Sequence, residues 1–406
     1  MIKDIENLDG WNIVGLPDIV FFQEGPGVRN NQYTDSGVKL INVANLKDGK
    51  VYLENTERYI SEEEAYGRYR HFLVDEGDLI IASSGIKVEY FDKKMGFINK
   101  EHLPLCMNTS TIRFKTLDEN ILDIKYFAYF LKTIYFKKQI ARLITGSAQL
   151  NFGPSHLKKI KVILPPLNIQ KKIVEVLEKS QYVINKRSEQ IEELELLVKS
   201  KFIEMFGDPV KNQKKLAKVK LSELGEWKTG GTPLRSKSEY YNGNIPWLSS
   251  GELNNKYCFK SNEMITESAI IESAAKIIEV GSLLLGMYDT AALKSTINMI
   301  ECSCNQAIAY SKLNENLVNT VYVYYCIQIG KEFYKSQQRG VRQKNLNLSM
   351  VKGLEILMPP LEFQNQFAEF VKQVDKLKFE MEKSLKELED NFNSLMQKAF
   401  RGELFK

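Results

Sequence analysis

The stretches LPPLNIQ at residues 164–170 and MPPLEFQ at residues 358–364 decide the fold of this chain. They belong to a longer internal repeat, in which identical residues recur 194 positions apart without a gap: Gly146 and Gly340, Gln149 and Gln343, Asn151 and Asn345, Ser155 and Ser349, Pro165-Pro166 and Pro359-Pro360, and Gln170 and Gln364. Solenoid repeats have much shorter periods, of about 20 to 50 residues. This interval has the size of a domain with its connection, so the sequence predicts two copies of one module.

Length and composition agree with two globular modules. At about 150 residues per domain, 406 residues correspond to two or three domains, and a hydrophobic content of 43% is enough for buried cores. No apolar run approaches the roughly 18 uncharged residues of a membrane span, and the first residues, MIKDIENLDGW, lack the apolar segment of a secretory signal. We therefore expect a cytoplasmic protein without a membrane partner.

Net charge and cysteine content leave the function open. The net charge of +5 permits nucleic-acid binding without requiring it. The five cysteines have no regular spacing, so they do not predict a disulfide framework. Cys302 and Cys304 form an isolated C-x-C, which is typical of reduced cysteines packed in or near a core.

The sequence lacks the residue patterns that carry catalysis. It contains no glycine-rich phosphate loop and no glycine-rich cofactor fingerprint after a strand, and its three histidines fall in no metal-ligand or nucleophile pattern. The acidic group Asp75, Glu76 and Asp78 suggests a nuclease site, but the second copy keeps only Glu279 and Ser282 there, which favours a turn before a strand. The sequence predicts a binding protein with no catalytic residue, no metal site and no cofactor.

Each module begins with strands. Short apolar runs bounded by Gly, Asp and Ser predict these strands, and a Tyr- and Phe-rich helix and one further strand follow in each copy. The predicted elements are strands at 77–82 and 281–286, helices at 123–143 and 318–337, and strands at 160–164 and 354–358. In the strand region the copies match with small insertions, as at Gly25 with Gly230 and Gly37 with Gly243. We expect an α+β fold with two similar domains of mixed or antiparallel strands and helices, at 1–164 and 207–358.

A long helix follows each double proline, at 165–206 and 359–406. The second proline suits the first turn of a helix, where its missing N–H costs nothing. Spacings of four and three alternate along a coiled-coil seam, whose expected members are Ile173, Leu177, Ile184, Arg187, Ile191, Leu194, Val198, Phe367, Val371, Val374, Met381, Leu385, Leu388 and Phe392. About 40 residues give a rod of about 60 Å. If the second module has its ends close together, the second helix starts where the first one stops, so we expect an antiparallel coiled coil.

Three matched seam positions are polar in one copy only. Ser180 matches Val374, Lys378 matches Ile184, and Arg187 matches Met381. Two interpretations remain open at this point: these are tolerated variations, or they set the register and pairing of the helices.

Polar loops recur at matching places in the two copies. They combine Gly with Arg, Lys, Asn, Gln, Ser and Tyr, at 25–32, 83–90 and 141–151, and at 230–241, 287–296 and 337–347. Arginine recognises guanine, Asn and Gln recognise adenine, and Lys and Ser hold phosphates. Such loops are often merely solvated, but their recurrence favours nucleic-acid contact. The candidate DNA-binding residues are Arg29, Asn31, Lys87, Arg142, Ser147, Gln149, Arg235, Lys237, Lys294, Arg339, Arg342, Gln343 and Lys344.

Four motifs resemble the specificity subunits of Type I restriction–modification systems, and the resemblance covers essentially the whole chain. These motifs are PPLNIQ (165–170), PPLEFQ (359–364), KSKFIEMFGDP (199–209) and QKAFRGELF (397–405). The resemblance implies a non-catalytic DNA-binding subunit. In it, 1–164 and 207–358 would be target-recognition domains for the two halves of an asymmetric target. The helices 165–206 and 359–406 would form the coiled coil that sets the spacer between the halves.

The resemblance also implies partners for this chain. They are double-stranded DNA, two modification subunits that carry S-adenosylmethionine and methylate adenine, and restriction subunits that use ATP and Mg²⁺. Two alternatives stay open. In the first alternative, the chain is a self-contained Type II-like restriction and methylation polypeptide. In the second, it is a coiled-coil adaptor whose salt-sensitive DNA binding has no sequence preference.

Overall fold

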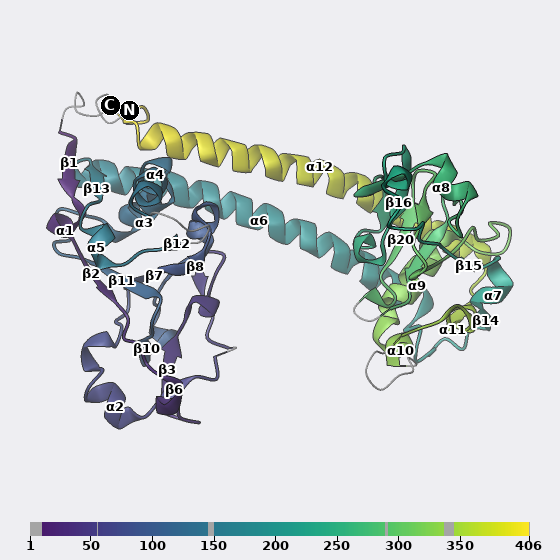
Figure 1. The fold of residues 1–406 in the computed structure, drawn as a ribbon, viewed down its shortest axis with the longest axis horizontal. Helices are drawn as coiled ribbons and strands as arrows, with labels where there is room; N and C mark the ends of the chain where they lie inside the picture. Colours follow the sequence, from purple (N-terminus) through teal and green to yellow (C-terminus); the bar gives the residue numbers. More distant parts are fainter. Residues whose placement is uncertain (1–9, 55, 145–149, 289–290, 337–344, 406) are drawn as a thin grey trace. The chain divides into compact units, whose positions relative to one another are not determined.

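The computed structural model describes residues 10–54, 56–144, 150–288, 291–336 and 345–405 (Figure 1). The chain divides into two compact units: unit 1 comprises Met1–Lys186 with Leu385–Lys406, and unit 2 comprises Arg187–Ser384. Among the described helices, none is long and apolar enough to cross a membrane. The two units share most of their strands and helices in the same order.

Unit 1 contains two main sheets. An antiparallel sheet has the order β2-β11-β7-β9, and a mixed sheet has the order β10-β3-β6, with β3 parallel to β10 and antiparallel to β6 (Figure 1). Its strands are β1 (Asn12–Gly15), β2 (Val20–Glu24), β3 (Val38–Ile41), β4 (Leu46–Lys47), β5 (Lys50–Val51), β6 (Tyr59–Ile60), β7 (Leu79–Ala82), β8 (Ser84–Ile86), β9 (Met95–Phe97), β10 (Leu105–Met107), β11 (Thr111–Thr116), β12 (Leu150–Asn151) and β13 (Lys161–Leu164). Its α-helices are α1 (Leu16–Ile19), α2 (Glu62–Tyr66), α3 (Ile124–Lys132), α4 (Ile134–Leu143), α5 (Pro154–Leu157) and the first half of α6 (Leu167–Phe206).

Unit 2 has the same arrangement of sheets, with one added edge strand in the larger sheet. Its larger sheet has the order β15-β22-β19-β20-β17, and in its mixed sheet β16 is parallel to β21 and antiparallel to β18. Its strands are β14 (Lys218–Lys220), β15 (Lys228–Thr229), β16 (Ile245–Leu248), β17 (Tyr257–Cys258), β18 (Glu263–Ile265), β19 (Leu283–Gly286), β20 (Ser295–Asn298), β21 (Ser303–Cys304), β22 (Ile308–Ser311) and β23 (Glu355–Leu357). Its helices are α7 (Leu221–Leu224), α8 (Glu267–Ile271), α9 (Thr320–Ile329), α10 (Lys331–Ser336), α11 (Leu348–Lys352) and the first part of α12 (Leu361–Ala399).

Matched glycines hold the same close backbone contacts in both units. A Cβ on Gly37 would lie 2.2 Å from the carbonyl oxygen of Ile60, and one on Gly243 would lie 2.0 Å from that of Ile265. Real Cβ atoms do not approach a carbonyl this closely, so both positions require glycine. A Cβ on Gly25 would lie 2.1 Å from the nearest backbone carbonyl oxygen, and one on Gly230 would lie 2.2 Å from its nearest carbonyl oxygen. The glycine pairing seen in the sequence is therefore a pairing of structural roles.

The sequence predicted one continuous helix before the double proline in each unit. This prediction was wrong, because each of these helices is interrupted. In unit 1 the helix breaks at Thr133, whose backbone is extended at ψ 156°; the Thr133 hydroxyl caps α4 by accepting the Phe136 N–H. In unit 2 the break falls at Gly330, between α9 and α10. The apolar pattern runs through both breaks because both halves bury aromatic residues, so periodicity alone did not locate them.

The glutamine of each PPLxxQ motif ties the long helix to the preceding helix. In unit 1, Gln170 is fully buried; its amide nitrogen donates to the Pro165 carbonyl at 2.8 Å, and its amide oxygen accepts the Asp123 N–H at 2.9 Å. In unit 2, Gln364 makes the same two bonds, to Pro359 at 2.8 Å and from Asn319 at 2.9 Å. A buried amide needs such partners. The motif is therefore a hydrogen-bonded junction.

Each unit is completed by the end of the helix that begins in the other unit. Helix α6 ends in unit 2, where the ring of Phe206 lies 4.9 Å from that of Tyr322. Helix α12 ends in unit 1, where Phe400 lies 5.0 Å from Tyr126. Phe206 and Phe400 are 194 positions apart, so the exchange follows the repeat.

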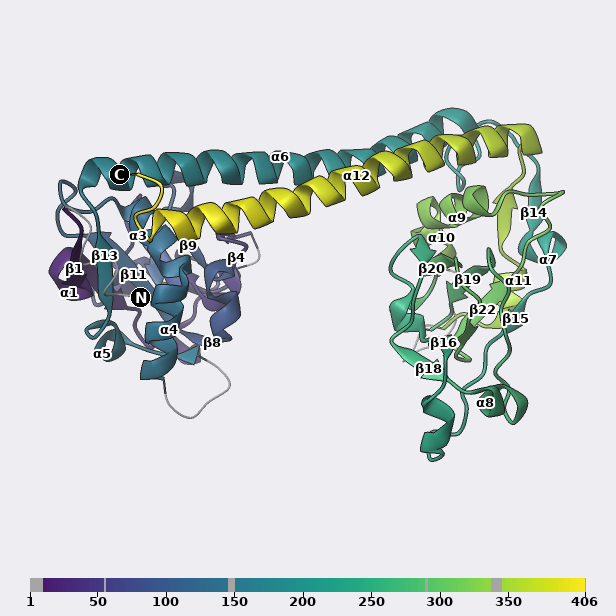
Figure 2. The same ribbon diagram turned by 90° about the horizontal axis from the view of Figure 1, so that it is seen from above.

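Within unit 2 the two long helices run antiparallel (Figure 2). Phe202, near the end of α6, packs at 5.4 Å against Phe367, near the start of α12. About two to three turns further along, Glu195 of α6 forms an ion pair with Lys378 of α12. One of the three polar seam positions thus has a charged partner on the facing helix, which favours a role in register.

The seam positions differ in burial. The buried members are Ile173, Leu177, Ile184, Leu194, Val198, Phe367, Val371 and Val374, and the half-buried members are Arg187, Ile191, Met381, Leu385, Leu388 and Phe392. Arg187 bonds along its own helix, from Nε to Gln190 Oε1 at 3.2 Å. The most buried seam positions therefore lie where the helices join the globular parts.

Candidate nucleic-acid interface

Two of the predicted loops of unit 1 are joined by a short sheet. Strand β8 pairs with β12, with Asn151 opposite Ser84, and the Phe152 N–H donates to the Ser83 carbonyl at 3.0 Å. Lys87 directly follows β8 and is exposed, so it lies beside the strand that follows the 141–149 loop. Two further candidates in that loop, Ser147 and Gln149, lie outside the described residues.

Unit 2 joins the corresponding loops in the same way. The Leu346 N–H donates to the Met287 carbonyl at 2.7 Å, and Tyr288 forms a β-bridge with Asn345. These bonds join residues that correspond, in the sequence repeat, to the bonded residues of unit 1. The correspondence becomes evident only once the strands are known. The candidates Arg339, Arg342, Gln343 and Lys344 lie outside the described residues.

Lys87 belongs to a lysine-lined cavity that sequence spacing did not reveal. The cavity has a volume of about 430 Å³, and its lining residues are Lys47, Asp48, Gly85, Lys87, Tyr90, Lys93 and Lys94. Four ammonium groups face one carboxylate, and the Lys93 ammonium lies 6.0 Å from the centre of the Tyr90 ring. Such a concentration of positive charge attracts a DNA phosphate. Of these lysines only Lys87 was predicted as a DNA contact; Lys93 and Lys94 end the 3₁₀ turn that Lys87 begins, and Lys47 comes from a distant segment.

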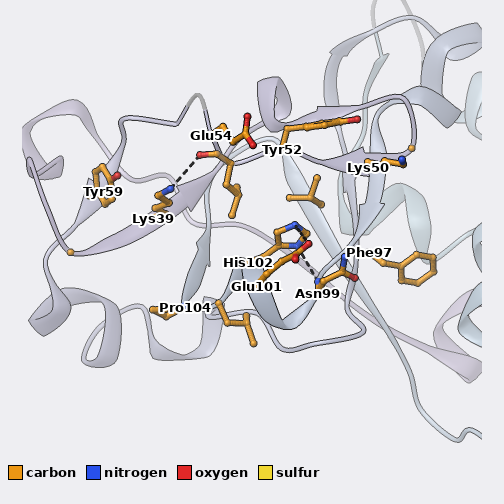
Figure 3. Close-up of a pocket in the computed structure, with 15 residues that line it drawn as sticks. Lys39, Lys50, Tyr52, Glu54, Tyr59, Phe97, Asn99, Glu101, His102 and Pro104 are labelled. Carbon is orange, nitrogen blue, oxygen red and sulfur yellow. Dashed lines mark hydrogen bonds and ion pairs between the residues drawn. The ribbon is translucent and has the colours of Figure 1, made fainter. Parts of the chain in front are cut away.

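The largest cavity of unit 1 has a different charge balance. Its volume is about 890 Å³, and it lies beside β3, β5 and β9 (Figure 3). Lys39 and Lys50 are offset by Glu54 and Glu101 among its lining residues, and His102 accepts the Asn99 N–H at 3.0 Å. With equal numbers of Lys and acidic side chains, this cavity is less suited to a phosphate than the lysine-lined cavity. No repeat or spacing in the sequence indicated it.

The remaining candidates of unit 1 are exposed and lie apart from these cavities. Arg29 and Asn31 flank the start of a 3₁₀ turn (Asn30–Gln32), where the Arg29 N–H donates to Gln32 Oε1 at 3.1 Å. Arg142, near the end of α4, lines a smaller cavity of about 150 Å³ with Lys138 and Lys161. The structure brings these residues to the surface but not into one site.

The described candidates of unit 2 have partners within the unit. Lys237 donates to the Tyr240 hydroxyl at 2.7 Å and pairs with Glu272 at 3.1 Å; the hydroxyl and then the carboxylate raise the pKa of Lys237. Lys294 donates to Asn254 Oδ1 at 2.8 Å. Arg235 forms a fork with Glu263, at 2.6 Å and 3.3 Å. Apart from Tyr240, three positions from Lys237, the partners lie 28 to 40 positions away in sequence, so composition alone did not show them.

The described residues contain no cluster of three or more His, Cys, Asp or Glu side chains arranged to hold a metal ion. The acidic group of the sequence has another arrangement, because Asp78 is buried beside Arg113 at 3.5 Å and accepts the Asp75 N–H at 2.9 Å. Burial raises the pKa of Asp78, while the Asp75 N–H, Lys115 and Arg113 act in the opposite sense. The group shapes the turn before β7.

Comparison with known families decides what this pair of loop-bearing units is. The sequence profile of the type I restriction modification DNA specificity domain matches residues 9–196 and again 213–390. The chain belongs to this family. Each specificity-domain match spans one set of strands, the double-proline junction and most of the following helix.

Relatives of this specificity-domain protein cover different shares of it. The MjaVIII specificity subunit of Methanocaldococcus jannaschii is 26% identical over 191 residues; the match covers 46% of this chain and 43% of that relative, so the chain spans less than half of its length. The MjaIX specificity subunit from the same organism is 21% identical over 97% of this chain and 93% of its own length. A solved chain, from work on complex assembly and conformational transition of the type I R-M system, has a TM-score of 0.61 at 16% identity. It covers 98% of this chain and 99% of its own length, and shows the same fold.

Proposed function

We propose that this chain is the specificity subunit of a Type I restriction–modification complex and that each unit recognises one half of a bipartite double-stranded DNA target. The observation that carries the proposal is the double match to the DNA specificity domain. Its support is the joining of polar loops in both units by the same backbone bond, Phe152 to Ser83 and Leu346 to Met287. Side chains of this composition recognise bases and phosphates.

The target is asymmetric in this proposal. The loop surfaces of the two units differ in charge: the cations Arg235, Lys237 and Lys294 have polar or acidic partners in unit 2, whereas Lys87 shares its cavity with three more lysines. Two unlike surfaces on one framework favour two unlike half-sites.

The spacer between the half-sites follows from the long helices in this proposal. Helix α6 has 40 residues and α12 has 39. At a rise of about 1.5 Å per residue each measures about 60 Å. Because each helix is continuous and contributes to both units, we propose that the pair sets the number of base pairs between the halves. Half-site spacing is a geometric consequence of where the reading elements are held.

The chemistry belongs to partner subunits in this proposal. Two modification subunits bring S-adenosylmethionine and methylate adenine, and restriction subunits bring ATP and Mg²⁺, while this chain remains non-catalytic. Apolar side chains on the long helices support docking of partners: Tyr182 is 62% exposed, Leu196 is 59% exposed and Phe379 is 65% exposed. Each of these side chains can lose contact with water when a partner subunit docks on its helix.

Sequencing of methylated adenines tests the proposal. The chain is expressed with its modification subunit in a host that lacks other adenine methylation. We expect methylation at one asymmetric motif with two short specified halves and a fixed unspecified spacer. A continuous motif, or no sequence preference, would contradict the proposal and favour the adaptor alternative.

A second measurement separates the self-contained enzyme. The purified chain is incubated alone with DNA and labelled S-adenosylmethionine. We expect no transfer of label without the modification subunit. Transfer by the chain alone would establish the Type II-like alternative instead.

A further inference from the structure

The guanidinium of Arg235 is held in one orientation on the surface of unit 2. Its Nη1 and Nη2 atoms donate to the two carboxylate oxygens of Glu263 at 2.6 Å and 3.3 Å. The guanidinium carbon lies 4.4 Å from the centre of the Tyr241 ring and 4.9 Å from that of Trp247. Ordering a long arginine side chain normally costs binding free energy. Here that ordering is in place before any ligand arrives.

The loop that carries Arg235 is anchored by the same aromatic residues. The Trp247 indole N–H donates to the Gly231 carbonyl at 3.0 Å, and the Tyr241 hydroxyl donates to the Pro233 carbonyl at 2.6 Å. Trp247 is itself buried in β16. The backbone just before Arg235 is therefore tied to Trp247 of the mixed sheet and to Tyr241.

One bidentate edge of the guanidinium remains open toward solvent. Glu263 occupies the Nη1–Nη2 edge, and no described residue accepts a hydrogen bond from Nε, so the Nε–Nη2 edge is available. The Arg235 side chain is 55% exposed. Two parallel N–H donors of this kind match O6 and N7 of guanine in the major groove, the commonest specific contact between arginine and a base.

The equivalent surface of unit 1 has the opposite partner. Counting from the matched glycines Gly37 and Gly243, Arg29 stands at the position of Arg235. Counting from the matched β6 and β18 residues Ile60 and Ile265, Arg58 stands at the position of Glu263. Arg58 lies 5.4 Å over the ring of Tyr33. Counting from the matched glycines Gly25 and Gly230 places Asn30 there instead, so the corresponding loop of unit 1 carries an arginine within one position of Arg235. Glu263 has no acidic counterpart in unit 1, because Arg58 stands in its place.

Lys237, two positions further along the same loop, provides an internal contrast. Its ammonium is a point charge, already bonded to Tyr240 and paired with Glu272. A point charge attracts phosphates but offers no flat pair of donors that matches one base. Arg235 and Lys237 therefore differ in kind although they share a loop and a charge.

We propose that Arg235 contacts one guanine of the half-site recognised by unit 2, and that Glu263, Tyr241 and Trp247 are the residues that position it. The inference rests on the proposed function and adds the base class and the residue. In this proposal the Nε–Nη2 edge of Arg235 contacts the base, and the Nη1–Nη2 edge stays bonded to Glu263.

The test measures base preference position by position. The chain is expressed with its modification subunit, and methylation is scored on a DNA library randomised at each position of the motif. For Arg235→Gln we expect the preference for guanine to fall about tenfold to a hundredfold at one position of one half-site. Arg235→Lys is expected to lose the same preference because it keeps the charge without the fork. Lys237→Gln, the matched control, is expected to keep every base preference.

Unchanged preferences in Arg235→Gln, with the bipartite motif present, would overturn the inference and leave the proposed function standing. A uniform loss at all positions would also overturn it, because that outcome indicates a phosphate contact. Absence of a bipartite motif in the wild-type complex would defeat the proposed function itself. Thermal unfolding of each variant checks folding. If Arg235→Gln does not fold, Glu263→Gln decides: a full guanine preference in that variant refutes the positioning by Glu263.

Discussion

The double-proline junction and the loop surface teach opposite lessons about the two units. At the junction, Gln170 and Gln364 share two bonds to matching backbone positions at the same distances, and Gln170 adds a third to the Ile121 carbonyl. At the loop surface, Arg58 stands where Glu263 stands in the other copy. A buried amide that lost a partner would cost free energy, whereas an exposed side chain is not so constrained. Burial has kept the copies alike, and exposure has let them differ.

Loss of the exchanged aromatic residues should have the largest effect. Phe206→Ala and Phe400→Ala each remove a ring buried among other rings, and we expect a loss of about 3 to 5 kcal/mol in each case. Hydrogen exchange localises the loss: Phe206→Ala should loosen unit 2, and Phe400→Ala should loosen unit 1. Loosening of the opposite unit would contradict the exchange of helix ends.

The junction glutamines come next. Gln170→Leu leaves three backbone partners without their bonds, the Asp123 N–H and the Ile121 and Pro165 carbonyls. We expect a loss of about 3 kcal/mol. Gln364→Leu removes two such backbone bonds, and we expect about 2 kcal/mol. Denaturant unfolding of both variants checks the order; equal or reversed losses would show that the third bond of Gln170, to the Ile121 carbonyl, adds no stability.

Two ion pairs of unit 2 differ in how far they are buried. Lys256 is 13% exposed and donates to Asp375 at 2.5 Å and to the Tyr325 hydroxyl at 3.0 Å, so Lys256→Met leaves a partly buried carboxylate and should cost about 2 kcal/mol. Lys378→Ile installs the residue type that unit 1 has at Ile184, and its partner Glu195 is 44% exposed. We expect a change within about 1 kcal/mol. Thermal unfolding measures both, and a larger loss in Lys378→Ile would assign the register to its ion pair.

Substitutions in the lysine-lined cavity and in the cavity beside β3, β5 and β9 should have the smallest effects. Lys87→Gln should lower the slope of the logarithm of DNA affinity against the logarithm of salt concentration by about one. Lys50→Gln, in the cavity with balanced charge, is the matched control and should leave the slope unchanged. Titrations of the complex at several salt concentrations provide the slopes. A lower slope in Lys50→Gln alone would indicate that the phosphate binds in the larger cavity instead.

Elements governed by regular spacing were accessible from the sequence. The PPLxxQ motif and heptad spacing predicted the first long helix from about Leu167, where α6 begins. The mixed and antiparallel strands and the antiparallel helices also agree with the structure. Thr133 escaped prediction because aromatic residues continue on both sides of the helix break.

Site residues were less accessible for a physical reason. Lys47, at the end of β4, reaches the cavity of Lys87, Lys93 and Lys94 only in the folded unit. The Arg235–Glu263 fork depends on the pairing of β16 with β18. Side chains from distant segments become neighbours through tertiary structure, which leaves no spacing in the sequence.

The exchange of helix ends has a consequence for synthesis of the chain. Tyr126 leaves the ribosome long before its ring partner Phe400 is made. At about 5 to 20 residues per second, the interval between them is about 14 to 55 seconds. Unit 2 receives Phe206 before most of its own strands exist, whereas unit 1 waits until unit 2 has been translated. The first unit to be translated is thus the last to be finished, and a ribosome that stops early releases it without its final core residue.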